Sequence, residues 1–278
     1  MKWKGRQRSS NVEYRRGAGG KTAIGGGLGI VVLIVYMLLG GNPGDIIGNN
    51  SIDQGSETPY VETAQEKELQ EFVSVVLHDT EVVWEDIFEQ QGMSYRAPTL
   101  VVFSGSVKSA CGIAGSATGP FYCSGDEKLY IDLSFCEELE KKLKAPGDFA
   151  MAYVIAHEVG HHVQNQLGVI DKVHDLRDKV SEEEYNKYTV KLELQADYLS
   201  GVWAHHAEKM GLLDAGDLEE ALTAASAVGD DTLQKQAQGY VVPDSFTHGT
   251  SEQRKRWFYK GFKSGNLDDW DTFNASDL

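Results

Sequence analysis

Basic residues are scarce in this 278-residue chain, which has 26 lysines and arginines against 42 aspartates and glutamates. Seven of the basic residues but only one acidic residue lie in positions 1–41, so the rest of the chain holds 19 basic and 41 acidic residues. A body this acidic repels phosphate backbones. We therefore expect no nucleic-acid partner.

Cysteine is nearly absent, with three residues in the chain. Their spacing does not match a zinc knuckle, which excludes a site of that type. Cys111 and Cys123 bracket the loop CGIAGSATGPFYC, whereas Cys136 stands apart in SFCEEL. We predict a Cys111–Cys123 disulfide, formed in an oxidising compartment; the alternative is three reduced, partly buried thiols.

Long apolar runs are also missing, apart from the uncharged segment 23–41, which contains IVVLIVYMLL. Its 19 residues are just enough to cross a bilayer as a helix. Basic residues precede it, so the positive-inside rule places residues 1–22 in the cytoplasm and the body of the chain outside it. We predict an uncleaved single-pass signal anchor; a cleaved signal peptide is the alternative.

The remaining chain divides into a polar linker at 42–62 and one domain at 63–278. No internal repeat is visible. Capping boxes predict the starts of three helices, at Thr63 with Glu66, Ser181 with Glu184, and Thr250 with Gln253. TLVVF (99–103) and LYIDL (129–133) are typical of strands. The expected fold class is α+β and mostly α, with a small sheet, behind an N-terminal transmembrane helix.

The stretch AHEVGHHVQNQ (156–166) places His157 and His161 four residues apart. On a helix this spacing brings both imidazoles to one face, where they can bind one metal ion. Glu158 is rotated from His157 by about 100°, so it can act on a metal-bound water without being a ligand. His162 points elsewhere and is expected to be a polar surface or supporting residue. The alternative is a core helix with two satisfied histidines.

A tetrahedral zinc site needs a third protein ligand besides water. KLELQADYLSGVWAHH (191–206) offers Glu193 and Asp197 in an otherwise apolar stretch, where unpaired carboxylates are costly to bury. We predict that Glu193 binds the metal and that Asp197 accepts a hydrogen bond from the outer nitrogen of a ligating histidine. Asp197 as the direct ligand is the alternative, and His205 is disfavoured because it lies about 120° round the helix. Two histidines and one carboxylate make Zn²⁺ the first choice of metal.

HEVGH (157–161) followed by ELQAD (193–197) resembles the gluzincin arrangement, HExxH on one helix and ExxxD on the next. The chain is more closely similar to the bacterial neutral zinc metallopeptidase family. The shared stretches cover nearly the whole chain: MKWKGR, SACG, GPFYC, LYIDLSF, HEVGHHVQNQLG, LELQADYLSGVWAHH and HGTSEQR. Cys136 is a departure, because an aromatic residue is more usual there. The resemblance implies a zincin-like domain in the periplasm, held by one segment in the bacterial inner membrane.

The resemblance also implies zinc-dependent hydrolysis of peptide bonds in peptide or protein substrates of the cell envelope. Glu158 would take a proton from the zinc-activated water and pass it to the leaving amine. His248, in THGTSEQR, is the candidate donor to the oxyanion, with Tyr153 and Tyr240 behind it. By analogy, the strand around 130–133 would be the edge strand on which an extended substrate docks.

Two other functions fit the same residues. One is a zinc-stabilised binding or scaffold module of the envelope that turns over little. Glu158 argues against it, because holding zinc needs no general base. The other is a zinc amidase acting on small peptides or peptidoglycan cross-links, which would use the same catalytic residues in a different cleft.

Overall fold

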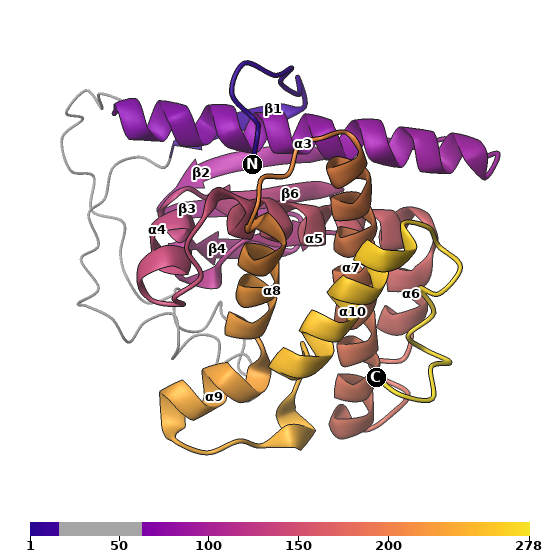
Figure 1. Ribbon diagram of the computed structural model, residues 1–278. Coiled ribbons are helices and arrows are strands. Elements are labelled where there is room, and N and C mark those ends of the chain that lie inside the picture. The colour runs from indigo at the N-terminus through magenta and orange to yellow at the C-terminus, as the bar shows by residue number, and fades with distance from the viewer. Residues whose placement is uncertain (17–62) are drawn as a thin grey trace.

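The computed structural model describes residues 1–16 and 63–278, which form a mostly helical α+β fold with small sheets (Figure 1). The predicted fold class is confirmed at this level. The predicted transmembrane helix at 23–41 and linker at 42–62 lie outside the described residues. Among the residues that are described, no helix is both long enough and apolar enough to cross a membrane.

The strands of the described residues form two sheets. In chain order they are β1 (Val12–Arg16), β2 (Thr99–Ser104), β3 (Ser106–Ser109), β4 (Gly112–Gly115), β5 (Phe121–Cys123) and β6 (Lys128–Asp132). The larger sheet has the order β1-β2-β6-β5, with β1 and β6 parallel to β2 and β5 antiparallel to β6. β3 and β4 form a separate antiparallel hairpin.

The two strands predicted from sequence correspond to β2 and β6. The expectation that β6 is the edge strand is wrong, because Tyr130 of β6 pairs with Phe121 of β5. The short β5 is the outer strand on this side of the sheet.

The helices carry most of the chain. They are α3 (Ala64–Gln90), α4 (Ser134–Lys141), α5 (Asp148–Gln166), α6 (Val169–His174), α7 (Glu182–Lys209), α8 (Asp217–Ala227), α9 (Asp230–Gln238) and α10 (Ser251–Ser264), with 3₁₀ turns η1 (Ser116–Thr118) and η2 (Pro243–Ser245). The predicted capping boxes at Thr63 and Thr250 are present, and the side chain of Ser181 caps α7.

Successive side chains of a strand point to opposite faces of the sheet, and each face packs into a different hydrophobic core. Leu100 and Leu129 face the main core, which they share with α3 and α5. Val101 and Tyr130 face the other way and pack with the β3–β4 hairpin. The predicted disulfide is confirmed: it joins Cys111, in the hairpin turn, to Cys123 of β5. It therefore ties the hairpin to the outer strand of the sheet.

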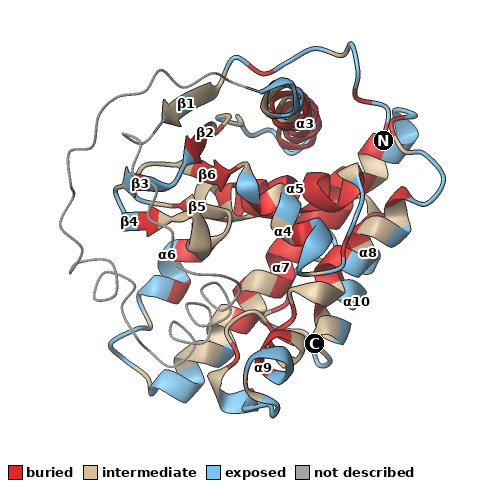
Figure 2. Cartoon of the chain, turned by 90° about the vertical axis from the view of Figure 1, so that its left-hand side faces the viewer, coloured by how far each residue is buried: buried red, intermediate tan, exposed pale blue. Residues whose placement is uncertain are grey.

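The most deeply buried helices are α5 and α7, which run through the centre of the molecule (Figure 2). α10 packs against α7 at very short range, because glycines remove the side chains at the crossing. A Cβ at Gly201 would lie 2.0 Å from the carbonyl oxygen of Phe258, and one at Gly261 would lie 1.9 Å from that of Tyr198. This close crossing brings the start of α10 over the middle of α7.

The N-terminal residues belong to the same body. β1 pairs with β2 in register from Val12 with Leu100 to Arg16 with Ser104. The predicted domain boundary at 63 therefore leaves out a strand of the sheet. The reason is that VEYRR (12–16) is short and charged at three of its five positions, so its alternation of Val12 and Tyr14 with Glu13 and Arg15 is a weak strand signal.

Candidate metal centre

The two histidines of the HEVGH stretch lie on α5 where it touches α7. The contact depends on Gly160: a Cβ there would lie 3.0 Å from the carbonyl oxygen of Ala196 and 3.4 Å from the Cβ of Leu199. Glycine is a poor helix former, and here it allows the two helices to approach closely. The backbone approach places Glu193 of α7 opposite His157 and His161.

His157, His161 and Glu193 converge on one point. Nε2 of His157 lies 3.1 Å from Oε2 of Glu193, and Nε2 of His161 lies 3.4 Å from Oε1 of the same carboxylate. One ligand atom from each of the three residues falls within 4.8 Å of the other two. The side chains are 8%, 12% and 13% exposed, so the point is sheltered but open to solvent.

Each histidine is fixed through its outer nitrogen. Nδ1 of His157 lies 2.8 Å from Oδ1 of Asp197, and Nδ1 of His161 lies 2.8 Å from Oε1 of Gln164. Both partners accept, so Nδ1 carries a proton in each ring, and Nε2, on the side facing Glu193, is the nitrogen that would bind a metal. This is the arrangement that a metal-binding imidazole needs.

Asp197 is the centre of a buried polar network. Arg254 of α10 donates to Oδ2 from Nε at 2.8 Å and to Oδ1 from Nη2 at 3.0 Å. The hydroxyl of Tyr153 donates to Oδ1 at 2.6 Å. Both carboxylate oxygens are therefore occupied, and Asp197 lies behind the Nδ1 side of His157. The alternative of Asp197 as a direct ligand does not fit this geometry.

The charges of the network shift the pKa values of its members. Burial would lower the pKa of His157, but Asp197 and Glu193 outweigh it and raise this pKa to about 9. Burial would raise the pKa of Asp197, but Arg254 and His157 lower it to about 2. Burial acts the same way on Glu193, whose pKa is nevertheless held well below its usual range by His161 and other neighbours. Both carboxylates are thus ionised at neutral pH.

Glu158 lies next to His157 and is 8% exposed. In the described part of the chain, its carboxylate makes no hydrogen bond or ion pair. A largely buried carboxylate without a partner is costly, and the oxygens of Glu158 can accept a hydrogen bond from a bound molecule.

His248 lies on the turn that precedes α10, and this turn is held by Asp230, the first residue of α9. One carboxylate oxygen of Asp230 accepts three backbone N–H groups, from Thr247 at 2.8 Å, His248 at 2.7 Å and Gly249 at 3.0 Å. Nδ1 of His248 lies 3.4 Å from the other oxygen of Asp230. Burial would lower the pKa of His248, but the negative charges of Glu193 and Asp230 raise it.

The two tyrosines proposed to stand behind His248 differ in placement. Tyr153 is buried, and its hydroxyl is already committed to Asp197. Tyr240 is 62% exposed. His205 binds the carbonyl oxygen of Phe262 at 2.8 Å, which removes it from the metal-facing set.

Of the two alternatives expected for His162, that of a polar surface residue is wrong. Its side chain is fully buried, and its ring nitrogens lie 2.9 Å from the hydroxyl of Tyr122 and 2.6 Å from the carbonyl oxygen of Arg96. Tyr122 belongs to β5, so His162 fastens the outer strand of the sheet to α5. Burial lowers the pKa of His162.

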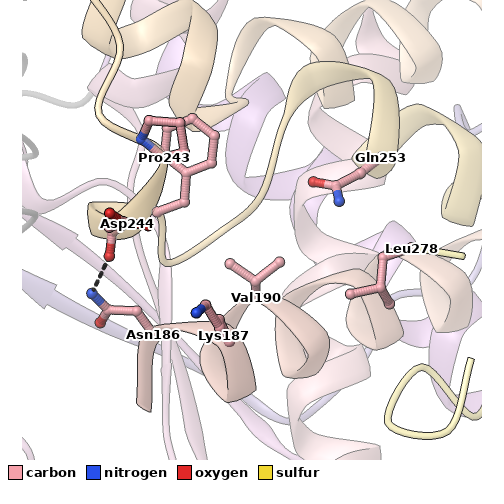
Figure 3. Close-up of a pocket in the computed structure, with 8 residues that line it drawn as sticks. Asn186, Lys187, Val190, Pro243, Asp244, Gln253 and Leu278 are labelled. Atoms are coloured by element: carbon pink, nitrogen blue, oxygen red, sulfur yellow. Dashed lines mark hydrogen bonds between the residues drawn. The ribbon is translucent and has the colours of Figure 1, made fainter. Parts of the chain in front are cut away.

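A pocket of about 180 Å³ opens between α7, η2 and α10 (Figure 3). Asn186 on one wall donates to the carbonyl oxygen of Asp244 on another, at 3.0 Å. Val190 lines the pocket three residues before Glu193, but none of the metal-facing side chains does. The pocket therefore lies beside the candidate centre rather than over it.

Gln164 and Arg254 support the two metal-facing histidines, and the sequence analysis did not predict either role. Gln164 follows His161 by three residues, which is a spacing that puts both on one helix face. Arg254 stands at the end of HGTSEQR, a stretch in which the sequence assigns His248 to the chemistry and Thr250 with Gln253 to the helix cap, but Arg254 to neither.

The donor set fits zinc. Two imidazole nitrogens and one carboxylate oxygen are the protein ligands of several catalytic zinc sites, which leave the fourth position open. The outer-nitrogen partners of both histidines complete the pattern expected of such a site.

Comparison with known proteins agrees with this geometry. A family model described as "Putative neutral zinc metallopeptidase" matches residues 1–273. The "uncharacterized protein YpfJ" of Escherichia coli K12 is 46% identical over 287 residues, which cover 99% of this chain and 100% of that protein. The "uncharacterized protein Mb2605" of Mycobacterium bovis is 37% identical over 261 residues, which cover 87% of this chain and 86% of that protein. No solved structure matches the chain. Because the family model spans nearly all of it, the chain belongs to the "Putative neutral zinc metallopeptidase" family, whose cofactor is Zn²⁺.

Proposed function

We propose that this protein is a zinc-dependent peptidase that hydrolyses peptide bonds with Glu158 as its general base. The observation that carries the proposal is the convergence of His157, His161 and Glu193 next to Glu158, whose carboxylate has no hydrogen bond or ion pair with the described residues. His157 and His161 would hold zinc through Nε2, and Glu193 through its carboxylate. Zinc in this position supplies a Lewis acid that polarises the scissile carbonyl and acidifies the attacking water.

The protein groups would then divide the work as follows. Glu158 accepts a proton from the attacking water and returns it to the leaving amine. His248 donates an N–H to the oxygen that becomes negative in the tetrahedral intermediate, and Asp230 holds the turn that carries it. Asp197 keeps His157 in the Nδ1–H tautomer, and Arg254 keeps Asp197 ionised.

The outer strand β5 is the proposed docking edge for an extended substrate. Tyr122 of β5 is bonded to His162 on α5, so this strand is fixed to the helix that carries the two metal-facing histidines. An outer strand can add a substrate chain by backbone pairing. Substrate docking, expected at β6 from the sequence, is thus proposed for β5.

The cell envelope is the proposed place of action. Disulfides persist in oxidising compartments, and the Cys111–Cys123 bridge ties β5 to its neighbouring hairpin. Membrane attachment through 23–41 stays a prediction, because that segment lies outside the described residues.

A binding or scaffold module with little turnover is the weaker candidate, because holding zinc requires no general base at Glu158. An amidase differs from a peptidase only in its substrate, and the same assay separates them. The test uses the full-length protein, a complex peptide mixture and mass spectrometry of new termini. We expect cleavage that a chelator abolishes and added Zn²⁺ restores. Cleavage that is indifferent to chelation would contradict a zinc-dependent reaction.

A further inference from the structure

Residues 1–16 are built into the domain that holds the metal centre. β1 pairs with β2, which therefore lies inside the sheet rather than at its edge. The side chains of β2 from Leu100 to Phe103 are at most 4% exposed. Without β1, this apolar strand would present unpaired backbone groups, which is the usual template for aggregation.

Two buried carboxylates of α3 accept hydrogen bonds from the N-terminal segment, which crosses over this helix (Figure 1). Asp79 is 1% exposed and receives bonds from the guanidinium of Arg6 at 2.7 and 3.3 Å. Glu81 is 6% exposed and accepts from Ser9 at 2.6 Å and from Asn11 at 2.8 Å. Among the described residues Asp79 has no other hydrogen-bond donor, so removal of residues 1–16 would leave its charge buried and unpaired.

The contacts continue to the first residue. The ring of Trp3, 7% exposed, packs edge-on against Phe72 with 5.4 Å between centroids. The α-amino group of Met1 lies 2.6 Å from Asp148 and 3.4 Å from Asp217, the first residues of α5 and α8. Apolar, ionic and backbone contacts thus join this segment to three helices and the sheet.

This packing constrains how the chain can meet a membrane. Paired strands lie about 4.8 Å apart, whereas the hydrocarbon core of a bilayer is about 30 Å thick. A chain that crossed once between residues 16 and 63 would put β1 and β2 on opposite sides, and the sheet could not form. We propose that residues 1–16 and the metal centre lie on the same side of the membrane. The predicted topology placed the basic segment in the cytoplasm and the domain outside it. The same-side arrangement replaces that prediction.

Cysteine labelling in cells tests the proposal on the full-length protein. The background is Cys136→Ser, which removes the half-buried free thiol. Ser10→Cys and Lys179→Cys are introduced separately, because both positions are exposed and one lies in each segment. Intact cells and spheroplasts are treated with a membrane-impermeant maleimide, and a permeant maleimide shows that each thiol can react. The proposal predicts that both positions are labelled or both are protected.

A second measurement tests whether β1 contacts the sheet in cells. Nζ of Lys128, on β6, lies 2.6 Å from Glu13, on β1, so the two side chains meet across the intervening strand β2. In cells, the double variant Glu13→Cys with Lys128→Cys is treated with a short permeant bismaleimide. We expect a cross-linked peptide pair within one chain, absent from either single variant. Labelling of one position but not the other, together with loss of this cross-link, would overturn the proposal.

Discussion

Arg254 of α10 donates hydrogen bonds to both carboxylate oxygens of Asp197 on α7, and Oδ1 of Asp197 lies 2.8 Å from Nδ1 of His157. A metal-facing histidine is thus positioned by a buried ion pair between two helices whose contact residues lie 57 positions apart in the chain. The side chains of the pair are 4% and 0% exposed, so neither charge can turn to water if the other is removed.

Arg254→Ala should therefore destabilise the protein and loosen the metal centre. Loss of one partner of a buried ion pair costs about 3–5 kcal/mol, and loss of an outer partner of a ligand lowers metal affinity about 10–100-fold. Arg256→Ala is the matched control on the same helix, because Arg256 pairs with Asp277 in solvent and should contribute at most about 1 kcal/mol. Denaturant unfolding and zinc titration measure both effects; equal results for the two variants would show that the Asp197 pair is not important.

Removal of the carboxylate at position 193 should strip the site of its third ligand. We expect Glu193→Ala to lower zinc affinity by more than about 100-fold, because the loss of a ligand exceeds the loss of an outer partner. Glu183→Ala on the same helix is the control, because Glu183 is exposed and forms an ion pair with Lys187 in solvent. Competition with a chromophoric chelator gives both affinities. An unchanged affinity in Glu193→Ala would remove this residue from the ligand set.

Zinc binding should release a proton from His157. The pKa of His157 is raised to about 9 in the metal-free protein, so Nε2 carries a proton at neutral pH that zinc must displace. Affinity should therefore rise with pH up to about 9 and level off above it. Calorimetry at pH 7 in buffers of different ionisation enthalpy should report about one proton released. A heat of binding that does not depend on the buffer would contradict the assigned protonation state.

His248 and Asp230 should act as one unit in turnover but not in metal binding. We expect His248→Ala to lower kcat about 10²–10³-fold, as loss of an oxyanion donor does elsewhere. Asp230→Asn, which weakens the turn carrying His248, should lower kcat in the same direction, and the double variant should lose little more than His248→Ala alone. Steady-state kinetics at saturating zinc tests this. Losses that multiply in the double variant would separate the two residues.

The residues closest to the metal could be predicted because their relationship is local. His157 and His161 share a face at a spacing of four on one helix, and Glu193 stands out as a charge in an apolar stretch. The capping boxes at Thr63 and Thr250 are likewise local signals, and both are present.

What depends on tertiary contact was not predictable. Arg254 reaches Asp197 only because glycines let α7 and α10 cross closely. His162 is buried by Tyr122 of β5 and by the chain at Arg96, two segments that no spacing rule links to α5. β1 has only a short alternation, Val12 and Tyr14 with Glu13 and Arg15, and its pairing with β2 depends on a segment more than 80 residues away in the chain. In each case a distant segment decides the environment.

Comparison of the wild-type chain with Glu158→Gln tests the central claim most directly. Both full-length proteins, including residues 1–16, are loaded with zinc and incubated with the same peptide mixture, and new termini are read by mass spectrometry. We predict equal zinc content and cleavage by the wild type that falls about 10²–10⁴-fold in the variant, because the general base is lost while the ligands remain. Equal cleavage by both proteins, or none by either with one zinc bound in each, would contradict the proposed peptidase mechanism.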